Sequence, residues 1–392
     1  MSKTSITCIE DLRVLARRRV PKMFYDYVDV GSWTEGTYRA NELDFQRMLL
    51  RQRVAVDVTT RNTGATMLGR AVSMPVAIAP TGLTGMIHAD GEILAARAAQ
   101  RFGIPFTLST VSICSIEDIA QATGGHPFWF QLYMMRDRRF VEKLVRRAHE
   151  AHCDALVLTL DLPISGQRHK DLKNGLTAPP RLTVANMVNM VGKPGWCLRM
   201  LGTRRRSFGN IVGHAEGVGD MASMADWSSR NYDPSVTWED IAWIRKIWER
   251  KLILKGILDA EDARQAQRVG ADAIIVSNHG GRQLDGAPSS IRALPAIVDA
   301  VGARTEVHLD SGVRSGQDVL KALALGARGV YIGRAMLYGL GALGEAGVTR
   351  ALEIIQKELD LTMAFCGHTD IARVDGDVLL RDSTQWPAAL AA

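Results

Sequence analysis

The sequence predicts an α/β fold, a (β/α)8 TIM barrel. Eight short apolar runs follow one another along the chain, and each ends in polar residues or glycine. The runs are apolar almost without interruption, as expected of parallel strands that are covered on both faces. Amphipathic, helix-like segments separate most of them, and eight strand–helix alternations are typical of this barrel. A doubly wound sheet, the rival fold, would more often have fewer strands and an early glycine fingerprint.

The strands can be assigned in chain order. Four runs come first: MPVAIAPTG from residue 74, PFTLST from 105, PFWFQLY from 127 and ALVLTLD from 155. Four more follow after a gap: KLILKG from 251, AIIVSNHG from 273, EVHLDSG from 306 and GVYIGR from 329. Segments such as GEILAARAAQRFG and DRRFVEKLVRRAHEAHC supply the helices between them.

Two segments fall outside the eight repeats, although we expect residues 1–392 to form one domain. Residues 1 to about 70 are predicted to be a helical N-terminal extension. Residues 162–236 are predicted to be an insertion after the fourth strand. Loops of this length in a compact domain are usually functional or mobile.

The amino-acid composition is that of an ordinary globular protein and excludes few functions. Of the 392 residues, 46% are hydrophobic and 23% are charged, an ordinary globular balance. The net charge of +6 suits an anionic ligand or an anionic membrane surface, but many soluble enzymes are equally basic. Five cysteines without CxxC spacing support neither a disulfide framework nor a zinc site, and they suggest a reducing compartment. Neither an apolar signal core nor a run long enough to span a membrane is found.

Polar side chains gather at the predicted strand ends, where barrels of this kind carry their chemistry. They are Thr81, Ser109, Gln131, Tyr133, Thr159, Asp161, Lys255, Ser277, His279, Asp310, Gly333 and Arg334. The alternative, that these are unrelated polar loop residues, would not favour such a set at all eight strand exits.

The stretch SNHGGRQLDG, residues 277–286, is the most informative of these strand ends. Its glycines allow a sharp turn or the close approach of a ligand. His279 can accept a proton near neutral pH, and Arg282 can bind a carboxylate through two hydrogen bonds. The stretch therefore predicts a site that holds an acid and removes a proton from it.

The last two strands end in LDSGVRSG and YIGRAM. Loops at this place in a barrel often bind phosphate through backbone N–H groups and a helix N-terminus. Arg314 and Arg334 would add positive charge, so we expect a phosphorylated substrate or cofactor there. The alternative is a pair of surface arginines.

Together these motifs resemble the FMN-dependent L-2-hydroxy acid dehydrogenase and oxidase family, which includes glycolate oxidase, L-lactate dehydrogenase and (S)-mandelate dehydrogenase. The similarity covers nearly the whole chain. It includes PKMFYDYVDVGS, MPVAIAPTGLTGM, FTLSTVS, WFQLY, LTLDLP, LILKGI, SNHGGRQLDG, DSGVRSG and IGRAMLY. GIPFTLSTVSICSIED and VSNHGGRQLDG resemble the bacterial respiratory L-lactate dehydrogenases in particular.

The resemblance implies that FMN binds at the top of the barrel, with no metal ion. The phosphate would lie at Gly312, Arg314, Gly333 and Arg334, and the ribityl chain at Asp310. The isoalloxazine would be lined by Ala79, Pro80, Thr81, Ser109, Gln131, Thr159 and Ser277. Lys255 matches the family's flavin lysine, whose ammonium stabilises negative charge on the reduced ring. A buried strand lysine neutralised by a carboxylate is the alternative.

The resemblance also implies roles in substrate binding and catalysis. Arg168 and Arg282 would bind the substrate carboxylate, because the arginine fork matches it and stays charged. Tyr27 would donate a third hydrogen bond, and Tyr133 would lie near the hydroxyl-bearing carbon.

His279 would be the general base, with Asp161 paired to it and favouring the imidazolium form. Alternatively, Asp161 caps the following helix, and Tyr27 is a core tyrosine. The resemblance further implies a homotetramer and a quinone or other respiratory electron acceptor. We expect a cytoplasmic enzyme, peripheral on the cytoplasmic face of the inner membrane.

Three positions bear on specificity and location. Val111 stands where glycolate oxidases commonly carry tryptophan, which favours lactate over glycolate, with mandelate and medium-chain hydroxy acids next. Gly82 stands where oxygen-using relatives usually have alanine, which favours a dehydrogenase over an oxidase; a tight turn is the alternative. Residues 186–206 mix apolar residues with arginines, as in a membrane-docking segment, a lid or a subunit contact.

Other functions have weaker support. GLGALG at 339–344 fits a nicotinamide fingerprint, but it lies inside a helix-like run. GTRRRSFG lacks a nucleic-acid recognition pattern, so we expect no nucleic-acid partner. A non-catalytic anion-binding barrel or a phosphate-handling isomerase stays open, and a purified protein without yellow flavin would favour either.

Overall fold

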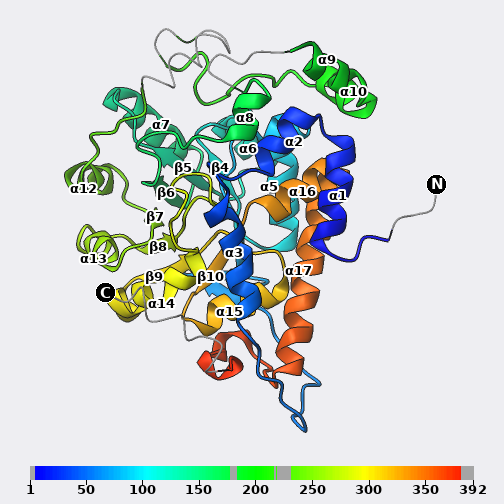
Figure 1. The fold of residues 1–392 in the computed structure, drawn as a ribbon. Coiled ribbons are helices and arrows are strands. Elements are labelled where there is room, and N and C mark those ends of the chain that lie inside the picture. Colours follow the sequence, from blue (N-terminus) through cyan, green and yellow to red (C-terminus); the bar gives the residue numbers. More distant parts are fainter. Residues whose placement is uncertain (1–4, 177–182, 216–217, 219–230, 381–392) are drawn as a thin grey trace.

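The chain forms a closed barrel of parallel strands (Figure 1). We describe it from a computed structural model, which covers residues 5–176, 183–215, 218 and 231–380. The eight-stranded sheet has the order β3-β10-β9-β8-β7-β6-β5-β4, and a parallel bridge between Ile78 and Phe106 joins its two ends. All eight predicted strands are confirmed. They are β3 (Val76–Ile78), β4 (Thr107–Ser109), β5 (Trp129–Tyr133), β6 (Ala155–Thr159), β7 (Lys251–Ile257), β8 (Ala273–Val276), β9 (Glu306–Leu309) and β10 (Gly329–Ile332).

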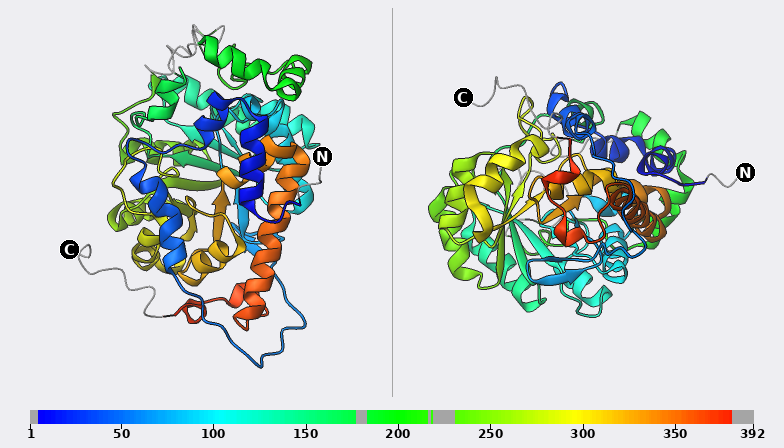
Figure 2. Two further views of the ribbon diagram at one scale, coloured as in Figure 1. Left: turned by 45° about the vertical axis from the view of Figure 1, so that its right-hand side comes forward. Right: turned by 90° about the horizontal axis from the view of Figure 1, so that it is seen from below.

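Helices surround the barrel, as the view from below shows (Figure 2). Those that follow the strands are α4 (Thr84–Ile87), α5 (Gly91–Phe102), α6 (Ile116–Ala122), α7 (Arg138–Glu150), α12 (Trp238–Ile247), α13 (Ala260–Arg268), α14 (Ser290–Val301), α15 (Gly316–Ala324), α16 (Arg334–Leu343) and α17 (Glu345–Phe365). Short 3-10 turns are η1 (Gly302–Arg304), η2 (Ile371–Arg373) and η3 (Gly376–Val378).

The N-terminal extension is helical only in its first part. Its helices are α1 (Ile9–Arg19), α2 (Lys22–Val28) and α3 (Gly36–Arg47), and the prediction of a helical segment up to about residue 70 was wrong beyond Arg47. An antiparallel hairpin follows, β1 (Ala65–Met67) and β2 (Arg70–Val72). Its turn places Leu68 and Gly69 at positive φ, as two-residue hairpin turns require. Met67 packs with Ala77, Trp129 and other inward-facing strand residues, and so fills one end of the barrel.

The predicted insertion contains three helices among its described residues. They are α8 (His169–Lys173), α9 (Val184–Val191) and α10 (Pro194–Gly202). α9 and α10 project beyond the top of the barrel, beside α1 and α2 (Figure 1). No helix in the described part of the chain is long and apolar enough to cross a membrane.

The glycines of GLGALG serve helix packing. The motif lies within and just after α16, not at a turn from a strand into a helix. A Cβ atom on Gly339 would lie 2.3 Å from the carbonyl oxygen of Gly347 in α17, so the two helix backbones touch there. This contact excludes the geometry of a dinucleotide fingerprint, which requires the loop between a strand and a helix.

We predict that Gly339→Ala destabilises the protein, because an added methyl group must push α16 away from α17. Overpacking of this kind costs roughly 1–3 kcal/mol, and the rigid backbone neighbour places the cost at the upper end. The melting temperature of the holoprotein measures the effect. Gly202→Ala at the end of α10, where a Cβ would meet nothing within 4 Å, is the matched control. Equal melting temperatures for the two variants would contradict this account.

Candidate active site

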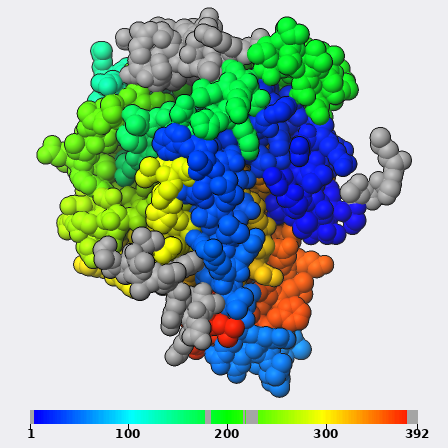
Figure 3. Space-filling model, viewed as in Figure 1, coloured from blue at the N-terminus to red at the C-terminus, as the bar shows by residue number. Residues whose placement is uncertain are grey.

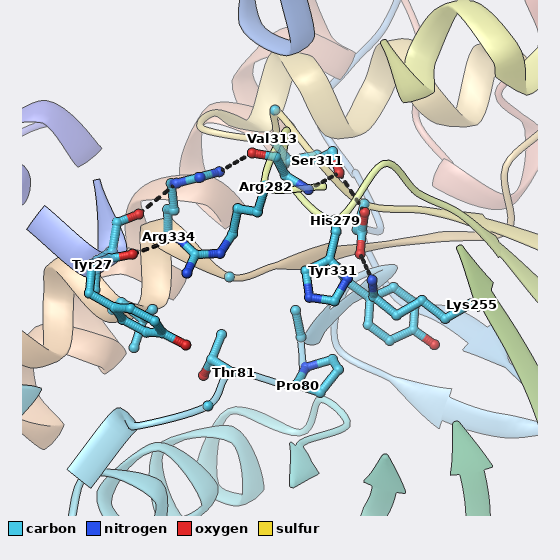
Figure 4. Close-up of a pocket in the computed structure, with 18 of the residues that line it drawn as sticks. Tyr27, Pro80, Thr81, Lys255, His279, Arg282, Ser311, Val313, Tyr331 and Arg334 are labelled. Atoms are coloured by element: carbon cyan, nitrogen blue, oxygen red, sulfur yellow. Dashed lines mark hydrogen bonds and ion pairs between the residues drawn. The ribbon is translucent and has the colours of Figure 1, made fainter. Parts of the chain in front are cut away.

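A cavity opens at the carboxyl ends of the barrel strands (Figure 4). Most of the predicted site residues line it. They are Tyr27, Ala79, Pro80, Thr81, Tyr133, Lys255, His279, Arg282, Asp310, Gly312, Arg314, Gly333 and Arg334, together with Gly82 and Val111. Ser109, Gln131, Thr159, Asp161, Arg168 and Ser277 are not part of the cavity wall and lie around it.

His279 and Asp161 form a hydrogen-bonded pair. Asp161 Oδ1 lies 2.8 Å from His279 Nδ1, and the ionised carboxylate can only accept, so Nδ1 carries the hydrogen. His279 is a non-glycine residue at φ 58°, held there by its N–H bond to Ser277 Oγ at 3.0 Å. Strained backbone of this kind is common at functional sites. Nε2 is therefore left as the proton acceptor, and the alternative that Asp161 caps a helix is wrong, because α8 begins after Arg168.

The site favours the neutral form of the His279 imidazole over the protonated form. Burial lowers its pKa below 6.5, and Lys255 and Arg282 lower it further, whereas Asp161 raises it without restoring the ordinary value. Asp161 thus favours the imidazolium form, as predicted, but burial and the two neighbouring cations outweigh its effect on the pKa of His279. Burial raises the pKa of Asp161, but the charges of His279 and Lys255 outweigh it and the net pKa is lowered. A neutral histidine beside an ionised carboxylate is the form that a general base needs.

Lys255 is a buried ammonium aimed by a β-bulge. The register of β7 against β8 shifts between Lys255 and Ile257, and Gly256 has φ 102°. A Cβ on Gly256 would lie 2.7 Å from Asp161, so only glycine lets the carboxylate come this close. Lys255 Nζ donates to Ser277 Oγ at 2.9 Å and lies 3.3 Å from Asp310 Oδ2. Burial lowers the pKa of Lys255, but Asp161 and Asp310 together raise it above the ordinary value, which keeps the charge in place.

Arg282 is held by carbonyl oxygens and has no carboxylate partner among the described residues. Its Nη1 donates to Tyr27 O at 2.5 Å, and its guanidinium lies 4.5 Å from the centre of the Tyr27 ring. Burial and then the neighbouring charge of Arg168 lower the pKa of Arg282 to about 10. A guanidinium destabilised in this way is a strong attractor for an incoming carboxylate.

Arg168 is close to this group but is already paired. Its Nε donates to Asp171 Oδ2 at 2.6 Å, and it does not line the cavity. Tyr133 does line the cavity, where it meets Tyr232 edge to face with ring centres 5.5 Å apart. Tyr232 belongs to the insertion and was not predicted, because a single tyrosine in a long loop gives no sequence signal.

The far end of the cavity is built to receive a phosphate. Arg334 is buried, begins α16, and donates to the carbonyl oxygens of Val28, Gly280 and Val30 at 2.8–2.9 Å. The half-buried Arg314 pairs with Glu42 at 2.9 Å, so neither arginine is a free surface residue. Gly312 has φ 100°, and a Cβ there would lie 2.3 Å from the carbonyl oxygen of Asn41. The N-terminus of α16, the two arginines and the closely approaching backbone at Gly312 together can bind an anion such as phosphate.

The residues around the cavity fit FMN. Gln131 Nε2 and Thr159 Oγ1 are buried and have no hydrogen-bond partner among the described residues. Buried polar atoms are normally paired, so both point to a missing polar ligand at the barrel's centre. Gln131 is oriented through Oε1, which accepts from Ser109 Oγ at 3.1 Å. Within the described part of the chain no group of acidic, histidine or cysteine side chains could hold a metal ion.

Sequence reasoning missed several residues that shape the cavity. Ser311, at φ 72°, donates to Asp310 and accepts from the N–H of Gly280. Tyr331 lines the cavity from β10, and its hydroxyl lies 3.2 Å from His308. Ser311 lay within the motif DSGVRSG, but Tyr331 sits among apolar strand residues and gave no signal.

Comparison with known proteins agrees with this site. The family model described as FMN-dependent dehydrogenase matches residues 16–381. An L-lactate dehydrogenase of Caulobacter vibrioides is 46% identical over 379 residues, covering 95% of this chain and 97% of that protein. An L-lactate dehydrogenase of Xanthobacter autotrophicus is 45% identical and covers 99% of each. A crystal structure of the monotopic membrane protein (S)-mandelate dehydrogenase matches with a TM-score of 0.91 at 39% identity, covering 96% of this chain and 100% of that one.

We predict that Asp161→Asn lowers the pKa of His279 further, because burial and Lys255 then act without the opposing carboxylate. NMR titration of ¹³C-labelled histidine in the cofactor-free protein, with the His279 signal identified by its loss in His279→Gln, measures the midpoint. The wild-type midpoint should lie below 6.5 and the variant's lower still. Asp299→Asn, at an exposed position on α14, is the charge-matched control and should leave the midpoint unchanged. A midpoint that rises in Asp161→Asn would refute the electrostatic account.

Proposed function

The chain belongs to the FMN-dependent dehydrogenase family, and from this premise we propose that it oxidises L-lactate to pyruvate and passes the electrons to a quinone. FMN-dependent oxidation of an L-2-hydroxy acid is the chemistry of the family. The observation that carries the proposal is Arg282, a cation without a carboxylate partner in the described structure, in the same cavity as the neutral base His279. The names of the relatives support lactate as the acid.

The residues divide the work of the reaction among them. Arg282 binds the carboxylate, with Tyr27 at the same end of the cavity. FMN supplies the two-electron acceptor for the α-carbon. His279 Nε2 takes the proton, from the hydroxyl group if a hydride leaves or from the α-carbon if a carbanion forms, and either route gives a 2-keto acid. Asp161 holds Nδ1–H and stabilises the imidazolium as it forms. The fixed Lys255 ammonium favours negative charge on the reduced cofactor.

Arg168 enters this proposal with a changed role. Its Nε is paired with the buried Asp171, so Arg168 would bind the substrate carboxylate only through its remaining N–H groups, as a second ligand beside Arg282. Arg282 is therefore the principal carboxylate ligand in our proposal.

Small residues beside the cavity leave room for an acid larger than glycolate. Val111 and Tyr27 both line it, and a Cβ on Gly82 would lie 2.8 Å from Val111 Cγ2 and 3.5 Å from Tyr27 Oη. Gly82 is not at positive φ, so space rather than a tight turn accounts for this glycine. Together Val111 and Gly82 leave room for the substrate methyl group.

We further propose that α9 and α10 dock the enzyme on a membrane. Val184, Val188, Val191, Leu198 and Leu201 are exposed, with 67–76% of each surface accessible, and exposed apolar groups at this density are typical of an interfacial helix. The similar (S)-mandelate dehydrogenase is described as a monotopic membrane protein, which supports membrane docking. Docking on the cytoplasmic face of the inner membrane would place the enzyme where a quinone is available, and a homotetramer would present four such surfaces.

Two residues of the segment 186–206 are not available for membrane contact. Trp196 is buried, stacked on Phe24 with ring centres 5.5 Å apart, and does not face outward. Arg205 pairs with Asp90 at 3.1 Å and Asp118 at 2.8 Å, and so is unavailable to lipid headgroups. The exposed Arg204 and Arg206 remain for that role.

We predict that anaerobic L-lactate bleaches the bound flavin and that D-lactate does not. His279→Ala should keep FMN and lose about 100- to 10,000-fold in reduction rate, the usual contribution of a general base. Arg282→Lys should raise the L-lactate concentration needed for half-maximal reduction, because one ammonium cannot replace the arginine fork. Stopped-flow absorbance of the flavin measures both effects. Failure of every L-2-hydroxy acid to reduce the flavin would exclude the function.

Reduced enzyme should react slowly with oxygen and rapidly with a soluble quinone analogue. The prediction rests on Gly82 and on the family resemblance. Flavin reoxidation is followed in air-saturated buffer and in anaerobic buffer with the quinone. Rapid formation of hydrogen peroxide would instead identify an oxidase.

Anionic liposomes should carry the intact protein to the top of a flotation gradient. Replacing residues 186–206 with a short Gly/Ser linker should leave it in the soluble fraction, because the exposed apolar residues and basic groups are lost together. Flavin content and L-lactate reduction of the deletion variant serve as the folding control. Equal flotation of both proteins, or none, would leave residues 186–206 as a lid or a subunit contact.

A further inference from the structure

A second cleft lies outside the active site, between the N-terminal helices and the insertion. It is bounded by α1, α2, α8 and the α9–α10 pair. Its lining residues are Arg13, Arg17, Val20, Lys22, Tyr25, Asp26, Asp29, Lys170, Asn189 and Lys193. Figure 3 shows the projecting α9–α10 segment in green beside the dark-blue α1 and α2.

The carboxylates of this cleft are already engaged. Asp29 accepts from Arg13, Tyr25, Tyr38 and Tyr338. Burial raises the pKa of Asp29, but these hydrogen bonds, led by that of Arg13, outweigh it and bring the pKa to about 2. Asp29 is therefore an ionised carboxylate that stabilises the fold, and its charge is already compensated by its hydrogen-bond donors.

Two of the five lining cations have no carboxylate partner among the described residues. Lys22 pairs with Asp26, and Lys170 lies 3.1 Å from Glu35. Lys193 donates to the carbonyl oxygen of Arg18 at 2.6 Å, which leaves its charge uncompensated. The exposed Arg17 side chain makes no hydrogen bond or ion pair in the described part of the chain.

Further uncompensated charge lies on α1 and α10, outside the cleft itself. Burial and then the nearby Arg19 lower the pKa of Arg199 in α10. Two cations that repel each other in this way are not neutralised from within the protein. The cleft and its surroundings are therefore prepared for an external anion.

The exposed apolar side of α9–α10 is held at a fixed position next to the cleft. Lys22 N–H donates to Asn189 Oδ1 at 2.7 Å, and Trp196 Nε1 donates to Met86 O at 2.9 Å while stacking on Phe24. These contacts fix the α9–α10 pair on α2 and α4. A molecule with a charged part in the cleft thus has apolar protein surface beside it at a set position.

We propose that this cleft binds the phosphodiester headgroup of an anionic phospholipid, while the exposed residues of α9 and α10 lie among the acyl chains. The inference rests on the proposed membrane docking and names the lipid that it requires. Arg17 supplies the guanidinium fork that matches phosphate oxygens, and Lys193 supplies a second charge. The adjoining apolar surface favours a lipid over a free phosphate, because only a lipid would use both.

Binding to vesicles tests this assignment. Wild type, Arg17→Glu and Arg18→Glu are compared by cosedimentation with phosphatidylglycerol–phosphatidylcholine vesicles and with pure phosphatidylcholine vesicles. Arg18 is exposed on the same helix and its side chain does not line the cleft; only its backbone carbonyl accepts from Lys193, and Arg18→Glu keeps that carbonyl while matching the charge change. Flavin content, melting temperature and L-lactate reduction should be the same in all three proteins.

Wild type should prefer the phosphatidylglycerol vesicles, and Arg17→Glu should weaken that binding about tenfold or more, clearly beyond Arg18→Glu. Excess glycerol 3-phosphate should compete only weakly. Equal losses of vesicle binding in Arg17→Glu and Arg18→Glu would overturn the headgroup site in the cleft. Membrane docking would then rest on nonspecific electrostatic attraction. Absence of wild-type binding to both vesicles would overturn docking itself. Tight binding of glycerol 3-phosphate without any vesicle preference would assign the cleft to a soluble phosphate.

Discussion

The active site depends on holding positive charge in place without neutralising all of it. Arg282 and Arg334 are bound by the carbonyl oxygens of Tyr27, Val28 and Val30, at and just beyond the C-terminus of α2. Carbonyl groups at a helix C-terminus carry partial negative charge, enough to stabilise a guanidinium but not to cancel it. The cavity therefore keeps a positive potential that a carboxylate and a phosphate can complete. A carboxylate in place of those carbonyls would remove the reason for either anion to bind.

This constraint gives the N-terminal extension a function beyond covering the barrel. α2 brings Tyr27 to the cavity, and Asp29 fixes α2 by accepting hydrogen bonds from Arg13, Tyr38 and Tyr338 of three other helices. The barrel supplies the base and the cofactor site, and the extension supplies the carbonyl groups that hold the arginines. The cleft beside α9 shares Asp29 and Arg13, so the proposed lipid site and the active site are built on the same anchored helices.

Features marked by a local sequence pattern, such as strands and motifs, were predictable from the sequence. Features that depend on contacts between residues far apart in the chain were not. Continuous apolar runs revealed all eight strands, and the family motifs placed His279, Lys255 and Arg282 correctly at one cavity. The lowered pKa of His279 depends on burial and on Asp161 and Lys255, which lie far from it along the chain. The hairpin after Arg47 was missed because its strands are three residues long, too short for a periodic signal.

The central claim, that an incompletely neutralised Arg282 recognises a carboxylate, is tested most directly by product binding to the oxidised holoenzyme. Pyruvate and its neutral amide, pyruvamide, have nearly the same shape and differ in charge, and neither can reduce the flavin. Titration of the flavin absorbance spectrum with each compound gives two dissociation constants. The account predicts saturable binding of pyruvate and at least a hundredfold weaker binding of pyruvamide, since a charged pair in a desolvated site is worth about 3 kcal/mol or more. Equal affinities would contradict it.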